Sequence, residues 1–215
     1  MFDYVFVDFD KTIFDCLAFE KDMWKVAQDH GVSAEDYKET YKQAIHPSTK
    51  DEYNYTFEGH IQFLKLRGCS NAEGLLGEWN SLLQNNYLFD GADVFLEFLR
   101  ANSTHLILLT AGNKEFQMKK ISSVPVQRYF DEIVVLDGHK DEYLSSLKID
   151  FSNSLFLNDS MRENVILKQR FPDLNIIVRF EKFDEHKYTE DQMKEFGTPF
   201  FETLSGIQEY IKSIL

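Results

Sequence analysis

The sequence is poor in cysteine and in basic residues. Its two cysteines, Cys16 and Cys69, are too few for a disulfide framework and lie in no metal-binding spacing, so we expect reduced thiols. Lys and Arg number 23 against 36 Asp and Glu, which gives a formal net charge of −13. Nucleic acids and anionic membranes bind basic surfaces, so this balance argues against both as partners. A small anionic substrate remains compatible, because a few local cations or one metal ion can reverse the field inside a cleft.

Long hydrophobic runs are also missing. No apolar stretch approaches the ~18 residues expected of a membrane-spanning helix. The amino-terminal segment has no basic region, and Asp3 and Asp8 interrupt its apolar run, so it does not resemble a signal peptide. We therefore expect a soluble, cytoplasmic protein. The oligomeric state leaves no signal in the sequence.

The sequence is rich in apolar and aromatic residues, and its first predicted strand is clearly delimited. Hydrophobic residues make up 43% and aromatic residues 15%, as in a globular protein. Residues 4–7 form an apolar run that predicts a strand buried on both faces, and Asp8 and Asp10 follow directly. Side chains two apart on an extended chain point to the same side, and two crowded carboxylates favour a cation between them. The simpler alternative is a strand followed by a solvated acidic turn.

Residues 15–88 have helical patterning and no convincing strand. The apolar spacing predicts four helices: one ending at Gly31, one from Ser33 to the break at Pro47, one from Tyr53 to near Gly68, and one from Ser70 through Leu83. This segment therefore reads as a helical insert.

The remainder of the chain alternates between strands and helices. The expected strands are 105–110, 132–136, 154–158 and 175–179, with a short edge strand at 199–201. The expected helices are 91–100, one around 116–121, 140–147, 160–171 and 207–214, and residues 181–197 read as a polar loop with a helical turn. Alternation of this kind predicts a parallel sheet with right-handed crossovers. Ligands bind such sheets at the carboxyl ends of the strands.

Four short motifs are similar to those of the haloacid dehalogenase-like hydrolases. They are Asp8-Phe9-Asp10-Lys11-Thr12, Leu108-Leu109-Thr110-Ala111-Gly112, Lys140, and Leu157-Asn158-Asp159-Ser160, in the family's order. The resemblance implies a Rossmann-like three-layer α/β/α core of residues 1–14 and 89–215. It also implies that residues 15–88 form a small four-helix cap domain.

The resemblance further implies a role for each carboxylate. Asp8 is expected to be the nucleophile that forms an aspartyl-phosphate, and Asp10 the general acid and base. Asp8, Asp159 and the backbone carbonyl of Asp10 are the expected ligands of Mg²⁺, which prefers oxygen donors. Glu163 stands where the family has a second acidic residue. With Ser160 it also forms a capping-box pattern, so it serves either the metal or only the helix start.

Phosphate binding is expected from the second and third motifs. The resemblance assigns phosphate oxygens to the Thr110 hydroxyl and the backbone N–H of Ala111, and an ion pair with the phosphate to Lys140. As alternatives, Thr110 only caps the next helix, or Lys148 or Lys120 takes the role of Lys140.

Two departures from the family pattern stand out. Asn158 replaces a usual glycine, so its side chain is expected to approach the metal or hold a water there. Lys11 replaces a frequent glycine, which is tolerable if its side chain points outward.

The presence of Asp10 separates the possible activities. A dehalogenase or a phosphonate-cleaving relative does not need an acid two residues after its nucleophile. The leading hypothesis is therefore a Mg²⁺-dependent phosphatase acting on a small phosphorylated metabolite. The first alternative is a phosphomutase resembling β-phosphoglucomutase, and the second is a non-catalytic binding or regulatory relative. The identity of the substrate depends on the cap, where the sequence is least informative.

Overall fold

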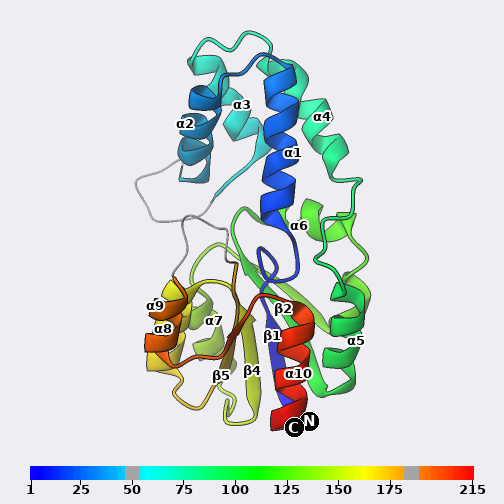
Figure 1. The fold of residues 1–215 in the computed structure, drawn as a ribbon, viewed down its shortest axis with the longest axis vertical. Helices are drawn as coiled ribbons and strands as arrows, with labels where there is room; N and C mark the ends of the chain where they lie inside the picture. The colour runs from blue at the N-terminus through cyan, green and yellow to red at the C-terminus, as the bar shows by residue number, and fades with distance from the viewer. Residues whose placement is uncertain (47–53, 182–188) are drawn as a thin grey trace.

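A six-stranded parallel sheet organises the molecule. The computed structural model describes residues 1–46, 54–181 and 189–215. The strands are β1 (Phe2–Val7), β2 (Ser103–Ala111), β3 (Glu132–Leu136), β4 (Ser154–Asn158), β5 (Asn175–Arg179) and β6 (Phe200–Phe201). They lie in the order β3-β2-β1-β4-β5-β6, and every pair is parallel. The expected Rossmann-like parallel sheet is confirmed, and β1 lies inside it (Figure 1).

Helices cover both faces of the sheet. They are α5 (Ala92–Ala101), α6 (Lys114–Ser123), α7 (Lys140–Leu147), α8 (Met161–Arg170), α9 (Glu190–Phe196) and α10 (Leu204–Ile214). Buried residues of α5, α6 and α10 pack against one face, and those of α7 and α8 pack against the other. Alternation along β1 explains the two layers, because Val5 and Val7 lie in the first cluster while Phe6 lies in the second. The result is the expected three-layer arrangement.

Helix α9 is more regular than the sequence suggests. Thr189 and Gln192 form a reciprocal capping box at its start, and Gly197 ends it in the left-handed conformation. The polar segment before it, residues 182–188, lies outside the described residues.

A separate group of helices lies beyond the carboxyl ends of the strands (Figure 1). It contains α1 (Cys16–Asp29), α2 (Ala34–Ile45), α3 (Phe57–Leu66), the short 3₁₀ helix η1 (Ala72–Gly74) and α4 (Leu75–Leu82). Thr56 caps α3, so that helix begins later than the apolar pattern predicts. The fourth expected helix is broken into η1 and α4. A side chain at Gly74 would meet the His30 ring at 2.7 Å, so glycine permits close approach of this junction to the end of α1.

Two adjacent stretches of chain connect this helical group to the sheet. Asp15 N donates to Tyr87 O at 2.7 Å, and Phe89 N donates to Ile13 O at 3.0 Å. The aromatic rings of Phe57 and Phe116 also meet, at 4.9 Å between centroids, where α3 faces α6. These contacts fix the helical group directly above the residues that follow β1.

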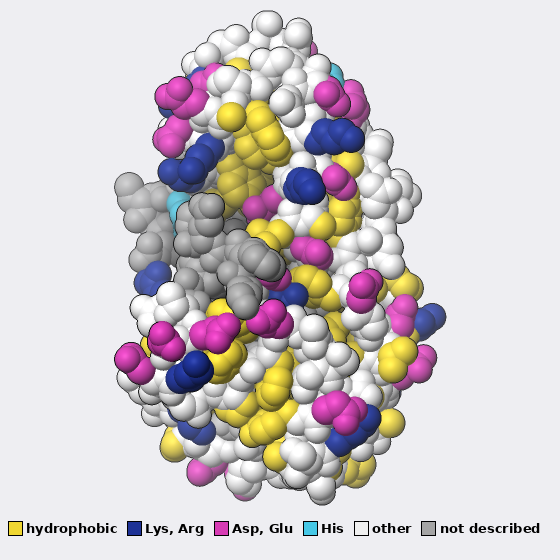
Figure 2. All heavy atoms as spheres, in the orientation of Figure 1, with side chains coloured by type: hydrophobic (Ala, Val, Ile, Leu, Met, Phe, Trp, Pro, Cys, Tyr) yellow, Lys and Arg dark blue, Asp and Glu magenta, His cyan; other side chains and the backbone are white. Residues whose placement is uncertain are grey.

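The charged surface agrees with the acidic composition. On the face shown in Figure 2, the described Lys and Arg side chains lie among Asp and Glu rather than forming one basic patch. Within residues 1–46, 54–181 and 189–215, no helix has both the length and the apolar character needed to cross a membrane.

Candidate active site

The carboxyl ends of β1, β2 and β4 bring the predicted residues to one edge of the sheet. Asp8 follows β1, Thr110 lies at the end of β2, and Asp159 follows β4. The register aligns Val7 with both Leu108 and Leu157, so these ends are level with one another. Hydrogen bonding of Asp8 N to Leu157 O at 2.9 Å continues the β1–β4 pairing into the site.

Asp8 is a buried carboxylate with a buried cation beside it. Its side chain is 6% exposed, and the Lys140 Nζ atom lies 2.8 Å from Asp8 Oδ1. The Thr12 hydroxyl lies 3.5 Å from Asp8 Oδ2. Burial raises the pKa of Asp8 to about 7, and the charges of Asp159 and Glu163 add to that increase while Lys140 opposes it. The single neighbouring cation therefore does not offset the cost of burying the charged form of Asp8.

Lys140 is shared among several acceptors. Its Nζ atom donates to Glu163 Oε2 at 2.9 Å and to Asn158 Oδ1 at 3.3 Å, in addition to Asp8. Burial acts to lower the pKa of Lys140, but the charges of Asp8 and Glu163 outweigh it and the pKa is raised. Among the three lysines considered from the sequence, Lys140 is the one that contacts Asp8. Lys148 is exposed at the carboxyl end of α7.

The side chain of Asn158 binds protein groups. It is fully buried, and its Nδ2 atom donates to Glu163 Oε2 at 2.9 Å and to Asn164 Oδ1 at 3.0 Å. Glu163 N donates to Ser160 Oγ at 3.4 Å, so the serine caps α8. The Glu163 carboxylate thus connects the lysine to the start of α8.

Asp10 lies in a second, separate cluster of donors. Lys120 Nζ contacts both of its oxygens, Oδ1 at 2.5 Å and Oδ2 at 2.7 Å. Gln117 Nε2 donates to Oδ2 at 2.8 Å, and Cys16 Sγ donates to Oδ1 at 3.3 Å. Burial opposes ionisation of Asp10, but Lys120 and these donors outweigh it and lower its pKa. Burial and the neighbouring carboxylate raise the pKa of the Cys16 thiol, which keeps it protonated.

Sequence patterns do not predict these partners of Asp10. Lys120 enters the sequence-based hypothesis only as an alternative to Lys140, and Gln117 does not enter it. Both lie on α6, three residues apart and on one helical face with Asn113. That polar spacing, on a helix otherwise packed through Phe116 and Ile121, is the signal that was available in the sequence.

Thr110 and Ala111 lie beside the same helix. The Thr110 hydroxyl is 3.4 Å from Gln117 Nε2, and Ala111 O accepts from the same amide at 3.0 Å. Asn113 caps α6 by accepting from Phe116 N at 3.0 Å, so the alternative in which Thr110 caps this helix is wrong. Thr110 is 1% exposed and lies at the carboxyl end of β2.

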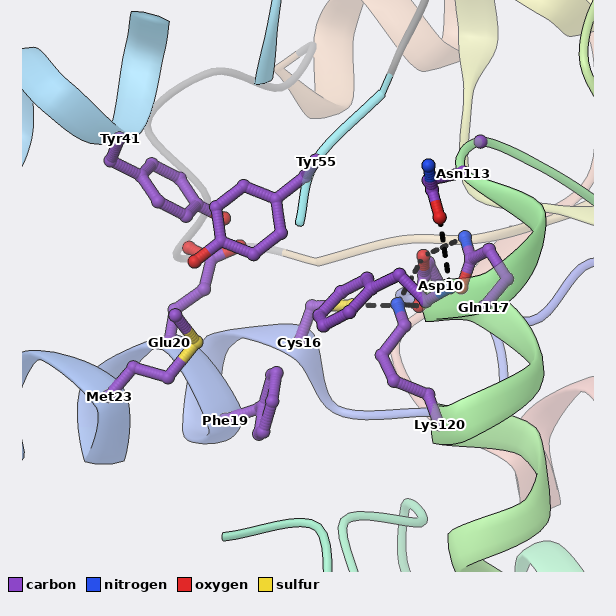
Figure 3. Close-up of a pocket in the computed structure, with 12 residues that line it drawn as sticks. Asp10, Cys16, Phe19, Glu20, Met23, Tyr41, Tyr55, Asn113, Gln117 and Lys120 are labelled. Atoms are coloured by element: carbon purple, nitrogen blue, oxygen red, sulfur yellow. Dashed lines mark hydrogen bonds and ion pairs between the residues drawn. The ribbon is translucent and has the colours of Figure 1, made fainter. Parts of the chain in front are cut away.

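A small cavity extends from Asp10 toward the helical group (Figure 3). Asp10, Gln117 and Lys120 lie at one end of the view, and Glu20 and Tyr41 lie at the other. The volume is about 40 Å³, which suits a few waters.

The donor set near Asp8 is compatible with Mg²⁺. Mg²⁺ commonly binds one or two carboxylates and keeps several waters. Asp8 and Asp159 provide two carboxylates; burial is the main reason that the pKa of Asp8 is raised, and repulsion by Asp159 adds to it, so a cation between the two would favour the ionised form. In the described part of the chain, no three acidic, His or Cys side chains are arranged as a ready metal cluster. Glu163 is engaged with Lys140.

Comparison with known proteins identifies the family. The family model described as haloacid dehalogenase-like hydrolase matches residues 5–163, and the chain belongs to this family. The match extends from the second half of β1 to the first turn of α8, so it contains every predicted site residue. A search of curated proteins finds no significant match.

Solved structures of this fold carry different activities. A provisionally named β-phosphoglucomutase of Thermotoga maritima has a TM-score of 0.68 at 14% identity, over 99% of this chain and 100% of that one. The magnesium-bound YfnB of Bacillus subtilis scores 0.64 at 18% identity, over 97% and 98%. A dehalogenase scores 0.70 at 16% identity, over 97% and 96%. At these identities the likeness shows the fold alone, and the reaction must be argued from the residues of this chain.

Proposed function

We propose that this protein is a Mg²⁺-dependent phosphatase that hydrolyses a phosphate monoester of a small metabolite. The observation that carries the proposal is a pair of carboxylates two residues apart, one buried and one partly buried, each in contact with its own buried lysine. Two such carboxylates can divide the work of nucleophile and proton carrier. Membership of the hydrolase family supports a hydrolytic reaction.

Asp8 acts as the nucleophile. Its Oδ atom bonds to phosphorus while the bond from phosphorus to the leaving oxygen breaks, which gives an aspartyl-phosphate. Asp10 donates a proton to the leaving oxygen in this first step and accepts a proton from the attacking water in the second. Water attack breaks the Asp8–phosphorus bond and releases inorganic phosphate.

The other residues stabilise the charge on the phosphoryl oxygens. The Thr110 hydroxyl and the Ala111 N–H bind one oxygen, and Lys140 bonds both Asp8 and the phosphate. Asp8, Asp159 and the Asp10 backbone carbonyl would hold Mg²⁺, which supplies positive charge beside Asp8. Glu163 orients Lys140 through their 2.9 Å contact.

Residues 15–88 act as a cap over a core of residues 1–14 and 89–215. The cavity between Asp10 and the helical group is smaller than a phosphorylated metabolite, so substrate entry requires the cap helices to separate from α6. Closure then excludes water from the leaving-group side of Asp10.

Three other activities compete with this proposal. A dehalogenase has no use for Asp10 as a proton carrier. A phosphomutase is the stronger alternative, because the fold is shared with the Thermotoga protein. A purely binding relative is disfavoured because all the core groups are present.

Hydrolysis of p-nitrophenyl phosphate tests the proposal directly. We expect Mg²⁺-stimulated release of phosphate by the wild type and a loss of about 10³-fold or more in Asp8→Asn. Asp3→Asn is the matched control, because Asp3 is an exposed aspartate on the same strand. Equal rates for the wild type and Asp8→Asn would refute the nucleophile. Conversion of a hexose 1-phosphate to its 6-phosphate without free phosphate would favour the mutase.

A further inference from the structure

The cavity above Asp10 has a wall of packed aromatic rings. Tyr41 lies 5.3 Å from Tyr55, and Tyr55 lies 5.2 Å from Phe116, measured between ring centroids. Phe19 of α1 lines the same space. Aromatic faces attract an ammonium group, whereas an uncharged polar group that leaves water gains little from them. The wall therefore suits an organic cation or an apolar group.

The charges that line this cavity favour the cation. They are the carboxylates of Asp10 and Glu20 and the ammonium of Lys120. Lys120 Nζ lies within 2.7 Å of both Asp10 oxygens, so the charges of this pair are balanced. Glu20 lies at the end of the cavity away from Asp10, and Figure 3 shows its side chain pointing toward the same region as the hydroxyl groups of Tyr41 and Tyr55. A ligand group at this end therefore meets a carboxylate among aromatic rings.

The hydroxyl of Tyr55 is a hydrogen-bond acceptor for a ligand. The Thr40 hydroxyl donates to a backbone carbonyl, Asp36 O, at 2.6 Å, so it accepts in its 3.0 Å contact with His60 Nε2. Burial lowers the pKa of His60 to about 3, so the ring is neutral and its Nδ1 atom is an acceptor. Tyr55 donates its one hydrogen to this Nδ1 atom at 3.0 Å. A ligand can therefore only donate to Tyr55 Oη.

Gln117 offers a further acceptor. It is 3% exposed and lines the cavity. Its Nε2 atom donates to Asp10 Oδ2 at 2.8 Å and to Ala111 O at 3.0 Å, and these two acceptors fix the orientation of the amide. Its Oε1 atom is buried and has no hydrogen-bond partner among the described residues. A hydrogen-bond donor on the ligand would satisfy this oxygen.

From these features we infer that the cavity binds the protonated amine of a short amino alcohol, so that the substrate is the phosphate monoester of such an alcohol. The inference rests on the proposed phosphatase activity and names its substrate class. Glu20 and the Tyr55 hydroxyl accept hydrogen bonds from the ammonium, and the aromatic rings replace part of its hydration. A leaving group that carries a carboxylate would instead be repelled by Glu20.

The dimensions of the cavity limit the length of the amino alcohol. Cys16 Sγ contacts Asp10 Oδ1, where the proposed reaction places the leaving oxygen, and Glu20 lies four residues, or about 6 Å, further along α1. Two or three carbons between the oxygen and the nitrogen fit within this span. A volume of about 40 Å³ holds a primary ammonium, which is close in size to a water, more readily than a trimethylammonium.

Hydrolysis of three phosphate esters tests the inference. The 2-aminoethyl, 2-hydroxyethyl and propyl esters are nearly equal in size and end in an ammonium, a hydroxyl and a methyl group. At neutral pH and saturating Mg²⁺, we expect kcat/KM of the wild type to be at least about tenfold higher for the aminoethyl ester than for either neutral ester. A ratio near one or below would overturn the inference. A higher kcat/KM for the choline ester would overturn the assignment of an amine that donates hydrogen bonds.

Glu20→Gln tests the carboxylate. Glutamine keeps the size of the side chain and removes its charge, so the ratio of kcat/KM for the aminoethyl ester to that for the hydroxyethyl ester should fall by about tenfold. The acidity of each leaving group is the same for both enzymes, so the change in the ratio reports the contact with the cation. Glu35→Gln, at an exposed position on α2, is the matched control and should leave the ratio unchanged. Tyr55→Phe should lower the ratio by about threefold.

The outcomes separate this inference from the proposed function. A purely structural role for Glu20 lowers kcat/KM for all esters equally, so an unchanged ratio in Glu20→Gln would overturn its role in binding. If Glu20→Gln fails to fold, the wild-type ratios decide the substrate class. Asp8-dependent hydrolysis of p-nitrophenyl phosphate without hydrolysis of the aminoethyl ester would refute only the inference. Absence of Asp8-dependent hydrolysis for every ester would refute the phosphatase itself.

Discussion

Asp8 and Asp10 are two residues apart, both are partly or fully buried, and each contacts a buried lysine, yet their proton affinities move in opposite directions. The pKa of Asp8 is raised to about 7, whereas the pKa of Asp10 is lowered. A lysine at hydrogen-bond distance is thus not sufficient to lower the pKa of a buried carboxylate.

Burial opposes ionisation of both carboxylates, and Asp8 is the more buried, with a side chain 6% exposed against 26% for Asp10. The other contacts of the two lysines add to the difference. Lys140 is shared between Asp8 and Glu163, and Asp159 adds a further negative charge nearby. The ion pair of Lys120 is with Asp10, whose other donors, Gln117 and Cys16, are neutral. The Asp8 cluster has an excess of negative charge that suits a metal ion, while the Asp10 cluster is balanced within the protein.

Removal of the Asp10 carboxylate should have the largest effect on the reaction. We expect Asp10→Asn to lower turnover by about 10²–10⁴-fold, because the attacking water loses its base. The Asp8 cluster stays intact, so a burst of one nitrophenolate per enzyme should precede the slow steady state. Stopped-flow measurement detects the burst, with Asp3→Asn as control. Unchanged turnover would remove Asp10 from the mechanism.

The changes in unfolding free energy caused by Asp10→Asn and by Asp8→Asn should depend on pH in opposite directions. The pKa of Asp10 is lowered from 3.8, so its contribution is present above pH 3.8 and is lost as the pH falls through the folded-state value. Asp10→Asn leaves Lys120 buried without a carboxylate, and we expect a loss of about 3 kcal/mol at neutral pH that shrinks in acid.

Asp8 should behave in the opposite way. Its folded-state pKa of about 7 lies above its ordinary value of 3.8, so Asp8 destabilises the fold increasingly as pH rises between these values. Asp8→Asn should therefore gain stability relative to the wild type as the pH rises from 5 to 7. Urea unfolding in EDTA measures both variants. Parallel pH trends would contradict the assigned charge balance.

Sequence reasoning reached the Asp8 cluster more fully than the Asp10 cluster. Asp8, Thr110 and Asp159 follow strands whose buried apolar runs are distinct, and parallel strands bring such ends to one edge of a sheet. The sheet, its faces and the bounds of three expected strands, 132–136, 154–158 and 175–179, follow from the same regularity. The caps of the helices were also recoverable, as Ser33 at the start of α2 illustrates.

The contacts of Asp10 depend on how α6 is rotated about its axis and on the burial of the charged Lys120. The apolar patterns that predict strands carry no information on either. Lys120 reads as a surface residue on a polar helix, because lysine is rarely buried unless it is paired. Its partner is 110 residues away in the sequence. The close approach of Gly74 to the His30 ring, at the junction of η1 and α4, is likewise a tertiary effect that helical spacing does not show.

Glu163→Gln sharpens the comparison by making the Asp8 cluster resemble the Asp10 cluster. It removes one charge that raises the pKa of Asp8 and frees Lys140 for Asp8, so the rising limb of kcat/KM should move to lower pH. At fixed Mg²⁺ we expect a rate at pH 6 about two- to threefold higher relative to the plateau. Glu142→Gln, an exposed change on α7, is the control. A shift to higher pH would mean that Glu163 acts mainly by orienting Lys140.

The smallest expected effect concerns the backbone that follows Asp10. Lys11 has φ of +57° and Lys148, at the carboxyl end of α7, has φ of +52°; the left-handed conformation of both favours glycine. Lys148→Gly should raise the free energy of unfolding by about 0.5 kcal/mol in urea titrations and leave kcat/KM unchanged. Lys11→Gly should relieve the same strain in the loop that carries Asp10. The N–H of residue 11, which bonds Phe14 O at 2.9 Å, is kept in the glycine variant. If Lys11→Gly gains stability equal to Lys148→Gly without loss of turnover, the position of Asp10 is set by Lys120 and Gln117 rather than by the loop. A loss of turnover with that gain would assign the positioning to the Lys11 turn, because glycine increases the conformational freedom of the backbone there.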